Sequence, residues 1–339
     1  MKNHWLIKSV ALLGFIGVLC LPLGAVVNPP APASAPPQGT ARPGTINYVE
    51  GQASIDGRTL SASQTGYVPL EPNQMLSTAN GKVEILLSPG VFLRLGSSSA
   101  VRMVSPELSQ PQIEVVRGEA MIEVDWMPKD QRIGVIERGA QASITKRGLY
   151  KFNSDSGTVA VIDGKIEVTE NGQTKEFGKG KEIALTAAKL KPASFDRKAE
   201  DDLYRWSNVR SGYLAEASLD TAQRYYAGGY GPYWNAGWYW DPYFDFWSWM
   251  PYDGYFWSPF GYPFFSPGYV GYAPYFGYGR FGYGRFGYGR GFASRGFGAR
   301  GTALAPRGFA GGGFHGGGFA GGGGFAGGGG FHGGAGGRR

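Results

Sequence analysis

The spacing of turn residues between positions 45 and 190 constrains the fold of this chain more than any other feature. Short runs of β-branched and aromatic residues are interrupted about every eight to twelve positions by Gly, Asn, Asp or Pro, which is typical of an all-β domain. No helical period of useful length precedes Pro192. Pairs that tolerate positive φ mark the expected tight turns: Asp56-Gly57, Asn80-Gly81, Asp163-Gly164 and Asn171-Gly172.

The expected strands alternate between apolar and polar positions. In residues 119–125, Ala120, Ile122 and Val124 alternate with Met121, Glu123 and Asp125. Glu119, Glu123 and Asp125 lie on or near one face at a spacing that could supply a hydrolytic pair. Alternating polar residues are also how a half-buried strand normally looks. We interpret this face as solvated, and expect amide replacements of Glu123 and Asp125 to leave binding unchanged.

The N-terminal residues 1–27 have the pattern of an export signal. Lys2 and Lys8 precede an apolar stretch over residues 10–21, and small residues such as Ala25 follow. Two alternatives stay open: lipoprotein processing at Cys20, against which the bulky Leu19 argues, and an uncleaved membrane anchor over residues 9–27. Residues 28–44 are rich in proline and predict a semi-rigid spacer.

Beyond the β domain, the sequence predicts one helix over residues 195–226, capped by Asp196. Its mixed apolar stripe is expected to pack on the β domain and contains Ala199, Leu203, Trp206, Arg210, Tyr213 and Ala217. Residues 227–275 are rich in Tyr, Trp and Pro, and residues 276–339 carry FGYGR and GGGF repeats. Because aliphatic side chains are nearly absent there and glycine raises the cost of ordering, we expect a low-complexity, mostly unfolded tail. Two readings of its aromatic residues 225–265 stay open: a partly collapsed tail that lies on its own β domain, and a surface for binding or self-association.

Charge and reactive residues exclude several function classes. The net charge of +7 comes almost wholly from residues 255–339, which contain arginine but no Asp, Glu or Lys. The three histidines, His4, His315 and His332, and the single Cys20 all lie outside the expected β domain. His- or Cys-based catalysis and His-based metal sites are therefore not expected in it. We predict no enzyme activity, no catalytic residue, no cofactor and no metal site.

Residues 45–190 resemble the FecR domain of bacterial envelope proteins. The resemblance is carried by INYVEGQASIDG, by the apolar strands on either side of Pro89-Gly90, by IEVVRGEAMIEV, and by the terminal hairpins of GTVAVIDGKIEVTENGQTKEFGKGKEIAL. It implies a solenoid-like or roll-like β domain that serves as a scaffold for protein contact. The sequence leaves the strand pairing open between β-solenoid, roll and sandwich, in that order of preference. Known FecR sensors pass a receptor signal to a sigma factor through a cytoplasmic N-terminal segment, for which the nine residues before the apolar run are too few.

These features together predict a non-enzymatic, exported scaffold of the bacterial envelope, in the periplasm or at the cell surface. An alternative location is the inner membrane, with the domain facing the periplasm. Expected partners are envelope proteins, polysaccharide or peptidoglycan, and further copies of the chain. The alternatives are a FecR-type regulatory sensor and, without export, an RGG-like RNA-binding protein. The expected interaction residues are aromatic or basic: Trp234, Trp238, Trp240, Trp247, Trp249, Trp257, Arg280, Arg285 and Arg290.

Overall fold

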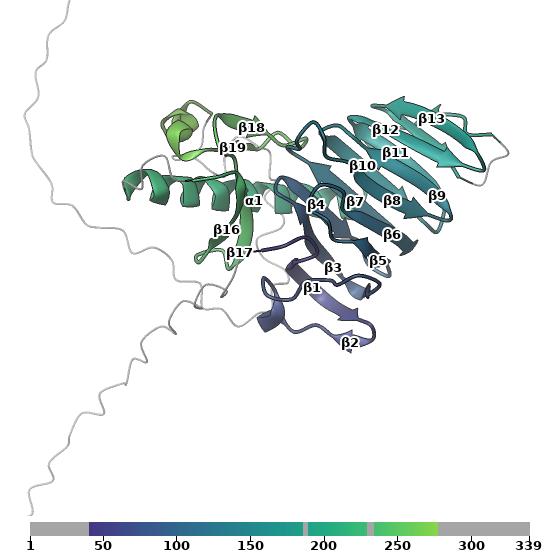
Figure 1. Ribbon diagram of the computed structural model, residues 1–339, viewed down its shortest axis with the longest axis horizontal. Helices are drawn as coiled ribbons and strands as arrows, with labels where there is room; N and C mark the ends of the chain where they lie inside the picture. The colour runs from purple at the N-terminus through teal and green to yellow at the C-terminus, as the bar shows by residue number, and fades with distance from the viewer. Residues whose placement is uncertain (1–40, 186–188, 229–233, 277–339) are drawn as a thin grey trace, which may run out of the picture. The chain divides into compact units, whose positions relative to one another are not determined.

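A computed structural model describes residues 41–185, 189–228 and 234–276 (Figure 1). The first range and the start of the second form one large β-sheet, and a helix and two hairpins follow. The strands of the sheet are β1 (Ile46–Ile55), β2 (Arg58–Thr59), β3 (Met75–Ser88), β4 (Val91–Leu95), β5 (Ala100–Ser105), β6 (Gln112–Arg117), β7 (Glu119–Val124), β8 (Ile133–Glu137), β9 (Ala140–Ile144), β10 (Gly148–Asn153), β11 (Thr158–Asp163), β12 (Lys165–Glu170), β13 (Gln173–Gly178), β14 (Lys181–Ala184) and β15 (Ala193–Ser194).

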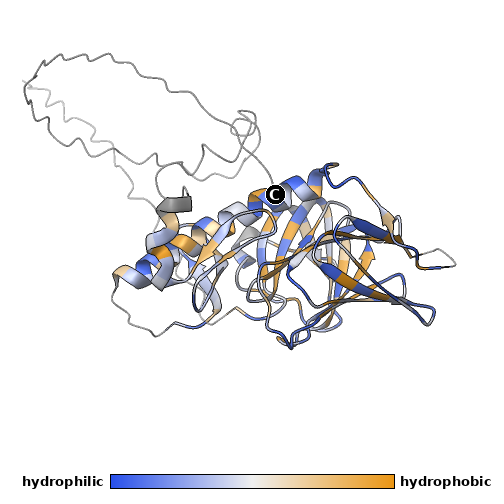
Figure 2. Cartoon of the chain, turned by 90° about the horizontal axis from the view of Figure 1, so that it is seen from above, coloured by the Kyte–Doolittle hydropathy of each residue, from blue (hydrophilic) through white to orange (hydrophobic). Residues whose placement is uncertain are grey.

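The chain weaves between two halves of this sheet. One half is formed by β5, β6, β8, β9, β12 and β13, the other by β4, β7, β10, β11, β14 and β15, and β3 lies between them. All pairs are antiparallel except β6 with β8. The halves curl toward one another, so that β11 contacts β13. Their inward side chains form one apolar core, and Figure 2 shows hydrophobic and hydrophilic residues alternating along the strands.

The turns confirm some sequence predictions and correct others. Asp56-Gly57 and Asn171-Gly172 have positive φ and close the β1–β2 and β12–β13 hairpins. Asn80-Gly81 lies inside β3, where a Cβ on Gly81 would come within 2.5 Å of the Glu50 carbonyl oxygen. Asp163-Gly164 joins β11 to β12, which do not pair. Gly81 therefore allows two strands to approach closely, and Gly164 lies where the chain crosses from one half of the sheet to the other.

The helix α1 (Asp202–Ala227) covers the outer face of the sheet. It begins later than predicted, because Asp201, and not Asp196, caps it by accepting a hydrogen bond from the Tyr204 amide at 2.8 Å. The prediction that it packs on the β domain is confirmed. Outward side chains of four neighbouring strands are buried beneath it and the hairpins that follow: Leu86, Phe92, Met121 and Leu149.

Residues 234–276 form a small aromatic module, and the expectation that this segment stays unpacked is wrong. Two hairpins, β16 (Gly237–Asp241) with β17 (Phe246–Met250) and β18 (Tyr255–Trp257) with β19 (Pro263–Phe265), precede the 3₁₀ helix η2 (Pro267–Phe276). Their rings pack on α1 and the sheet, which replaces the missing aliphatic core. The fold class, a mostly-β domain followed by one helix, is confirmed. The predicted unfolded repeats of 277–339 lie outside the described residues.

Candidate interaction surface

A buried network of charged side chains lies on the outer face of the sheet. Adjacent strands β3, β4 and β7 carry Glu84, Arg94 and Glu123, and all three side chains are fully buried. The Arg94 Nε lies 2.9 Å from Glu84 Oε2, and its Nη1 donates to Glu123 Oε2. The guanidinium therefore joins two carboxylates from the strands on either side of its own. Burial of this charge is possible because each ion has a partner of opposite sign.

Helix α1 adds a second cation to the network. The Arg210 Nη2 donates to Glu84 Oε1 at 2.8 Å, and the next residue, Ser211, donates its hydroxyl to Glu123 Oε1 at 2.6 Å. The Arg210 guanidinium lies 4.1 Å from the Tyr48 ring centre and 4.5 Å from that of Phe246. These cation–π contacts reach from β1 to β17. Arg210 thus joins the sheet, the helix and the aromatic module.

The network shifts the pKa of its members. Burial alone would raise the pKa of Glu84, but the charges and hydrogen bonds of Arg210 and Arg94 outweigh it and lower this pKa to about 2. Burial acts to lower the pKa of Arg94, yet Glu123 and Glu84 raise it above its ordinary value. Glu84 is therefore ionised throughout the physiological range, and the network is permanently charged.

The aromatic module is pinned directly to the sheet by Asn47 of β1. Its amide nitrogen donates to both Glu84 Oε1 and the Trp247 carbonyl, and its Oδ1 accepts from the Trp247 amide, each at 2.9 Å. The Trp247 indole donates to the Gly66 carbonyl at 2.9 Å, and Ser248 donates to the Leu214 carbonyl of α1 at 2.6 Å. These bonds satisfy buried polar groups and set the position of β17 against sheet and helix.

The interpretation of Glu119, Glu123 and Asp125 as a solvated strand face is wrong. Glu123 and Asp125 are buried because α1 and the aromatic module cover this side of β7, whereas Glu119 is half-buried and pairs with Lys151 at 2.9 Å. Burial, reinforced by the neighbouring charge of Glu123, raises the pKa of Asp125 well above its usual value. Burial thus disfavours the ionised form of Asp125. None of these three carboxyl groups lines either of the two surface hollows described below.

The predicted interaction tryptophans separate into buried and accessible groups. Trp247 and Trp249 are buried, and the Trp249 ring packs against those of Trp126, Phe256 and Phe264. These two act as core residues. The remaining four are half-buried and keep part of their rings accessible: Trp234, Trp238, Trp240 and Trp257. The predicted Arg280, Arg285 and Arg290 lie outside the described residues. Tyrosines, which the sequence interpretation did not single out, supply the most exposed rings.

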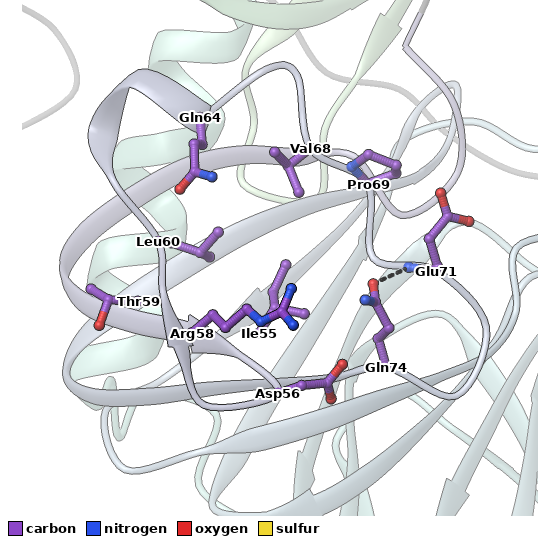
Figure 3. A pocket seen from close by; sticks show the side chains of 10 residues that line it. All are labelled: Ile55, Asp56, Arg58, Thr59, Leu60, Gln64, Val68, Pro69, Glu71 and Gln74. Carbon is purple, nitrogen blue, oxygen red and sulfur yellow. Dashed lines mark hydrogen bonds between the residues drawn. The ribbon is translucent and has the colours of Figure 1, made fainter.

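Two surface hollows are open to solvent. One, of about 460 Å³, is bordered by Trp238 and Tyr239 of β16, by Asn235, by Arg42 before β1, and by Leu108 between β5 and β6. The other, of about 530 Å³, lies between the β1–β2 hairpin and the segment that leads into β3 (Figure 3). Its charged side chains, Asp56, Arg58 and Glu71, have mixed signs, and Asp56 and Glu71 already bond to Met75 and Arg42. Of the two hollows, only the one beside β16 is lined by aromatic side chains, those of Trp238 and Tyr239.

In the parts of the chain that the structure describes, no three His, Cys, Asp or Glu side chains gather in a way that could hold a metal ion. Across the same ranges, no helix combines the length and apolar character needed to cross a bilayer.

The fold and this surface define a curled β domain whose outer face is covered by its own helix and aromatic module. The family model described as FecR protein matches residues 74–167, from the segment before β3 into β12. The chain therefore contains a FecR domain, as its sequence predicts.

Two crystal structures of a "putative anti-sigma factor" from Parabacteroides distasonis ATCC 8503, at 1.65 Å and 2.50 Å resolution, are similar to this chain. Their sequence identities are 16% and 15%, and their TM-scores are 0.32 and 0.33. The similarity covers 42% and 44% of this chain, and 64% and 73% of those chains. No curated protein matches the chain.

Proposed function

We propose that this chain is an exported, non-enzymatic scaffold of the bacterial envelope. In this proposal the FecR domain and α1 hold the aromatic module as a rigid platform for an envelope polymer. The observation that carries it is the pinning of β17 by Asn47, because β17 pairs with β16 and so positions Trp238 and Tyr239. A surface whose rings are already ordered loses little side-chain entropy when a partner binds.

The chemistry of the hollow beside β16 supports a polysaccharide or peptidoglycan partner. An indole and a phenol border it and offer flat faces on which sugar rings can stack. The Asn235 and Arg42 side chains at the same hollow supply hydrogen-bond donors for hydroxyl or carboxylate groups. A few polar groups around an aromatic floor are typical of small-molecule and glycan recognition.

Cosedimentation with isolated cell-wall sacculi tests the polymer contact. We expect the full-length protein to cosediment and Trp238→Ala to lower the bound fraction several-fold. Trp257→Ala is the matched control, since this half-buried tryptophan is on the other hairpin and does not border the hollow. Circular dichroism would establish that both variants fold. Equal binding by wild type and Trp238→Ala, or no binding by wild type, would contradict the proposal.

Cell fractionation tests the proposed location. We expect the tagged full-length chain in the periplasmic or surface fraction. Recovery in the cytosol would refute export and would favour the RNA-binding alternative for the arginine-rich tail.

A regulatory role in FecR-type sigma-factor signalling is the second candidate, and the FecR match over residues 74–167 favours it. This role requires a partner that carries the signal to a sigma factor. Transcript levels separate the candidates: a scaffold leaves sigma-dependent transcripts unchanged when the gene is deleted, whereas a sensor changes them.

A further inference from the structure

Two turns of the aromatic module repeat the same combination of side chains. The β16–β17 turn contains Pro242, Tyr243 and Asp245, and the turn before β18 contains Pro251, Tyr252 and Asp253. The tyrosines are 83% and 58% exposed, and both aspartates are exposed. We call these two segments, residues 242–245 and 251–254, the tyrosine turns. Each places a carboxylate within two residues of an exposed tyrosine, and of the two aspartates Asp245 already takes part in an interaction within the chain.

The first tyrosine turn is held in place from below. The buried Asp241 carboxylate accepts hydrogen bonds from the amides of Tyr243 at 2.8 Å and Phe244 at 3.1 Å. The Asp245 amide donates to the Asp241 carbonyl at 2.8 Å, which closes the turn. Arg224 of α1 pairs with Asp241 at 2.8 Å and neutralises its charge. The turn is therefore preorganised, and the exposed Tyr243 ring is presented on a fixed base.

The second tyrosine turn is anchored through its backbone. The Trp234 indole donates to the Tyr252 carbonyl at 2.6 Å, and the Ser266 amide donates to the Gly254 carbonyl at 3.0 Å. Gly254 has φ of +73°, which glycine adopts without strain. Within the described ranges, Asp253 forms no salt bridge. Its carboxylate is available to an external cation.

The charges of the aromatic module and of the C-terminal repeats are complementary. Residues 234–276 contain three aspartates and no Lys, Arg or His. Residues 277–339 contain eight arginines and no acidic residue, and three of these recur at a spacing of five in the FGYGR repeats. A guanidinium is able to stack on an aromatic face and to pair with a carboxylate, so a tyrosine turn offers it two kinds of contact. An acidic surface rich in tyrosine therefore meets its chemical counterpart in the same sequence.

We propose that the tyrosine turns bind the arginines of the FGYGR repeats, residues 276–290, of a second copy of this chain. Each chain carries two tyrosine turns and three FGYGR arginines, Arg280, Arg285 and Arg290, so two copies can form several such contacts at once. Single contacts of this kind are weak, but several per chain act together. The resulting self-association is reversible, depends on concentration and weakens with salt.

Sedimentation velocity of the full-length protein over a range of concentrations tests this inference. We expect wild type to associate, with association reduced when salt is raised from about 0.05 M to about 0.5 M. The double substitution Tyr243→Ala and Tyr252→Ala should lower the association constant about tenfold, through the loss of two exposed cation–π contacts. Replacing Arg280, Arg285 and Arg290 by Gln should have the same effect. Asp253→Asn should weaken association less.

Tyr226→Ala is the matched control, because Tyr226 is 66% exposed but lies on α1 outside both tyrosine turns. It should associate as wild type does. Wild type that stays monomeric at all concentrations would overturn the inference, as would a double variant that associates like wild type. Association that is unchanged in the arginine variant would also overturn it. These results are independent of sacculus binding, so this inference and the proposed function can fail separately.

Discussion

Glu84 provides the sharpest test of how the FecR domain, α1 and the aromatic module are held together. Its carboxylate accepts hydrogen bonds from Asn47, Arg94 and Arg210, which come from β1, β4 and α1. Glu84→Gln keeps the shape of the side chain but removes the negative charge. The amide then has one acceptor oxygen where the carboxylate had two. Its NH₂ group, itself a donor, faces the donors of Asn47, Arg94 and Arg210. We expect a large loss of stability without a new cavity.

The size of the loss follows from the pKa of Glu84. This pKa falls from 4.5 to about 2 on folding, and one pKa unit corresponds to about 1.4 kcal/mol, so ionised Glu84 stabilises the fold by about 3 kcal/mol. Because the folded-state pKa is the lower one, this contribution is complete above the unfolded-state value. It is lost as pH falls from about 4.5 to about 2. Glu84→Gln should therefore cost about 3 kcal/mol at pH 7 and progressively less in acid.

Urea unfolding followed by tryptophan fluorescence measures this difference at neutral and acidic pH. Glu114→Gln is the control, because Glu114 pairs with Arg102 on a partly exposed part of the sheet. Such pairs contribute under about 1 kcal/mol, so the control should stay near wild type. A loss below about 1 kcal/mol for Glu84→Gln at pH 7 would refute the reasoning. So would a loss that stays constant as the solution is acidified.

Three further substitutions test other parts of the structure. Burial raises the pKa of Glu137 to about 8, so folding opposes its ionisation and stability falls as pH rises from about 4.5 to 8. Glu137→Gln should therefore raise the urea midpoint relative to wild type at pH 9, with little difference near pH 4.5. Trp249→Ala should cost about 3–5 kcal/mol in urea unfolding, because it empties the centre of the aromatic module, and near-wild-type stability would contradict that packing. Asn47→Ala removes the bonds to Trp247 and should increase amide hydrogen exchange in β17, whereas unchanged exchange would show that the pin is dispensable.

The strands of the β domain were predictable because short stretches of neighbouring residues specify them. Turn pairs such as Asn171-Gly172 and alternating runs such as residues 119–125 specify strands without reference to distant parts of the chain. Turn chemistry left strand pairing undetermined. Asn80-Gly81 has the composition of a hairpin turn but lies within β3, where two strands approach closely. The FecR resemblance indicated the order of the strands along the sequence. The structure shows where the chain crosses between the two halves of the sheet.

The buried network could not be predicted because its partners come from distant parts of the sequence. Glu84 and Arg210 are separated by 126 positions, and Glu123 and Ser211 by 88. The alternation of apolar and polar residues around Glu123 indicates that β7 has one polar face. Only the position of α1 shows that this face is covered. One clue was available: Leu86 and Phe92 are large apolar residues on the supposedly solvated side of their strands. Arg210 in the predicted stripe of the helix was a second clue.

The aromatic module was mistaken for unfolded chain because low aliphatic content usually prevents a packed core. Here Trp249, Phe264 and Phe246 replace aliphatic side chains, and the module packs on α1 and the sheet and does not form a core alone. Tyrosines were underestimated for a related reason. Tyr243 is exposed while neighbouring rings are buried, and composition alone does not separate rings that lie in the core from those on the surface.

The pairing of Asn47 with Trp247 has a consequence for biogenesis. The two residues are 200 positions apart, and a ribosome completes the first long before the second is made. Until then, the side of the sheet that carries Leu86 and Phe92 lacks the part of its cover that the aromatic module supplies, and a nascent chain at that stage exposes apolar surface. Closing so long a loop also slows the final docking step. Nascent chains stalled before residue 247 should therefore depend on chaperones, and that dependence should end once β17 has emerged.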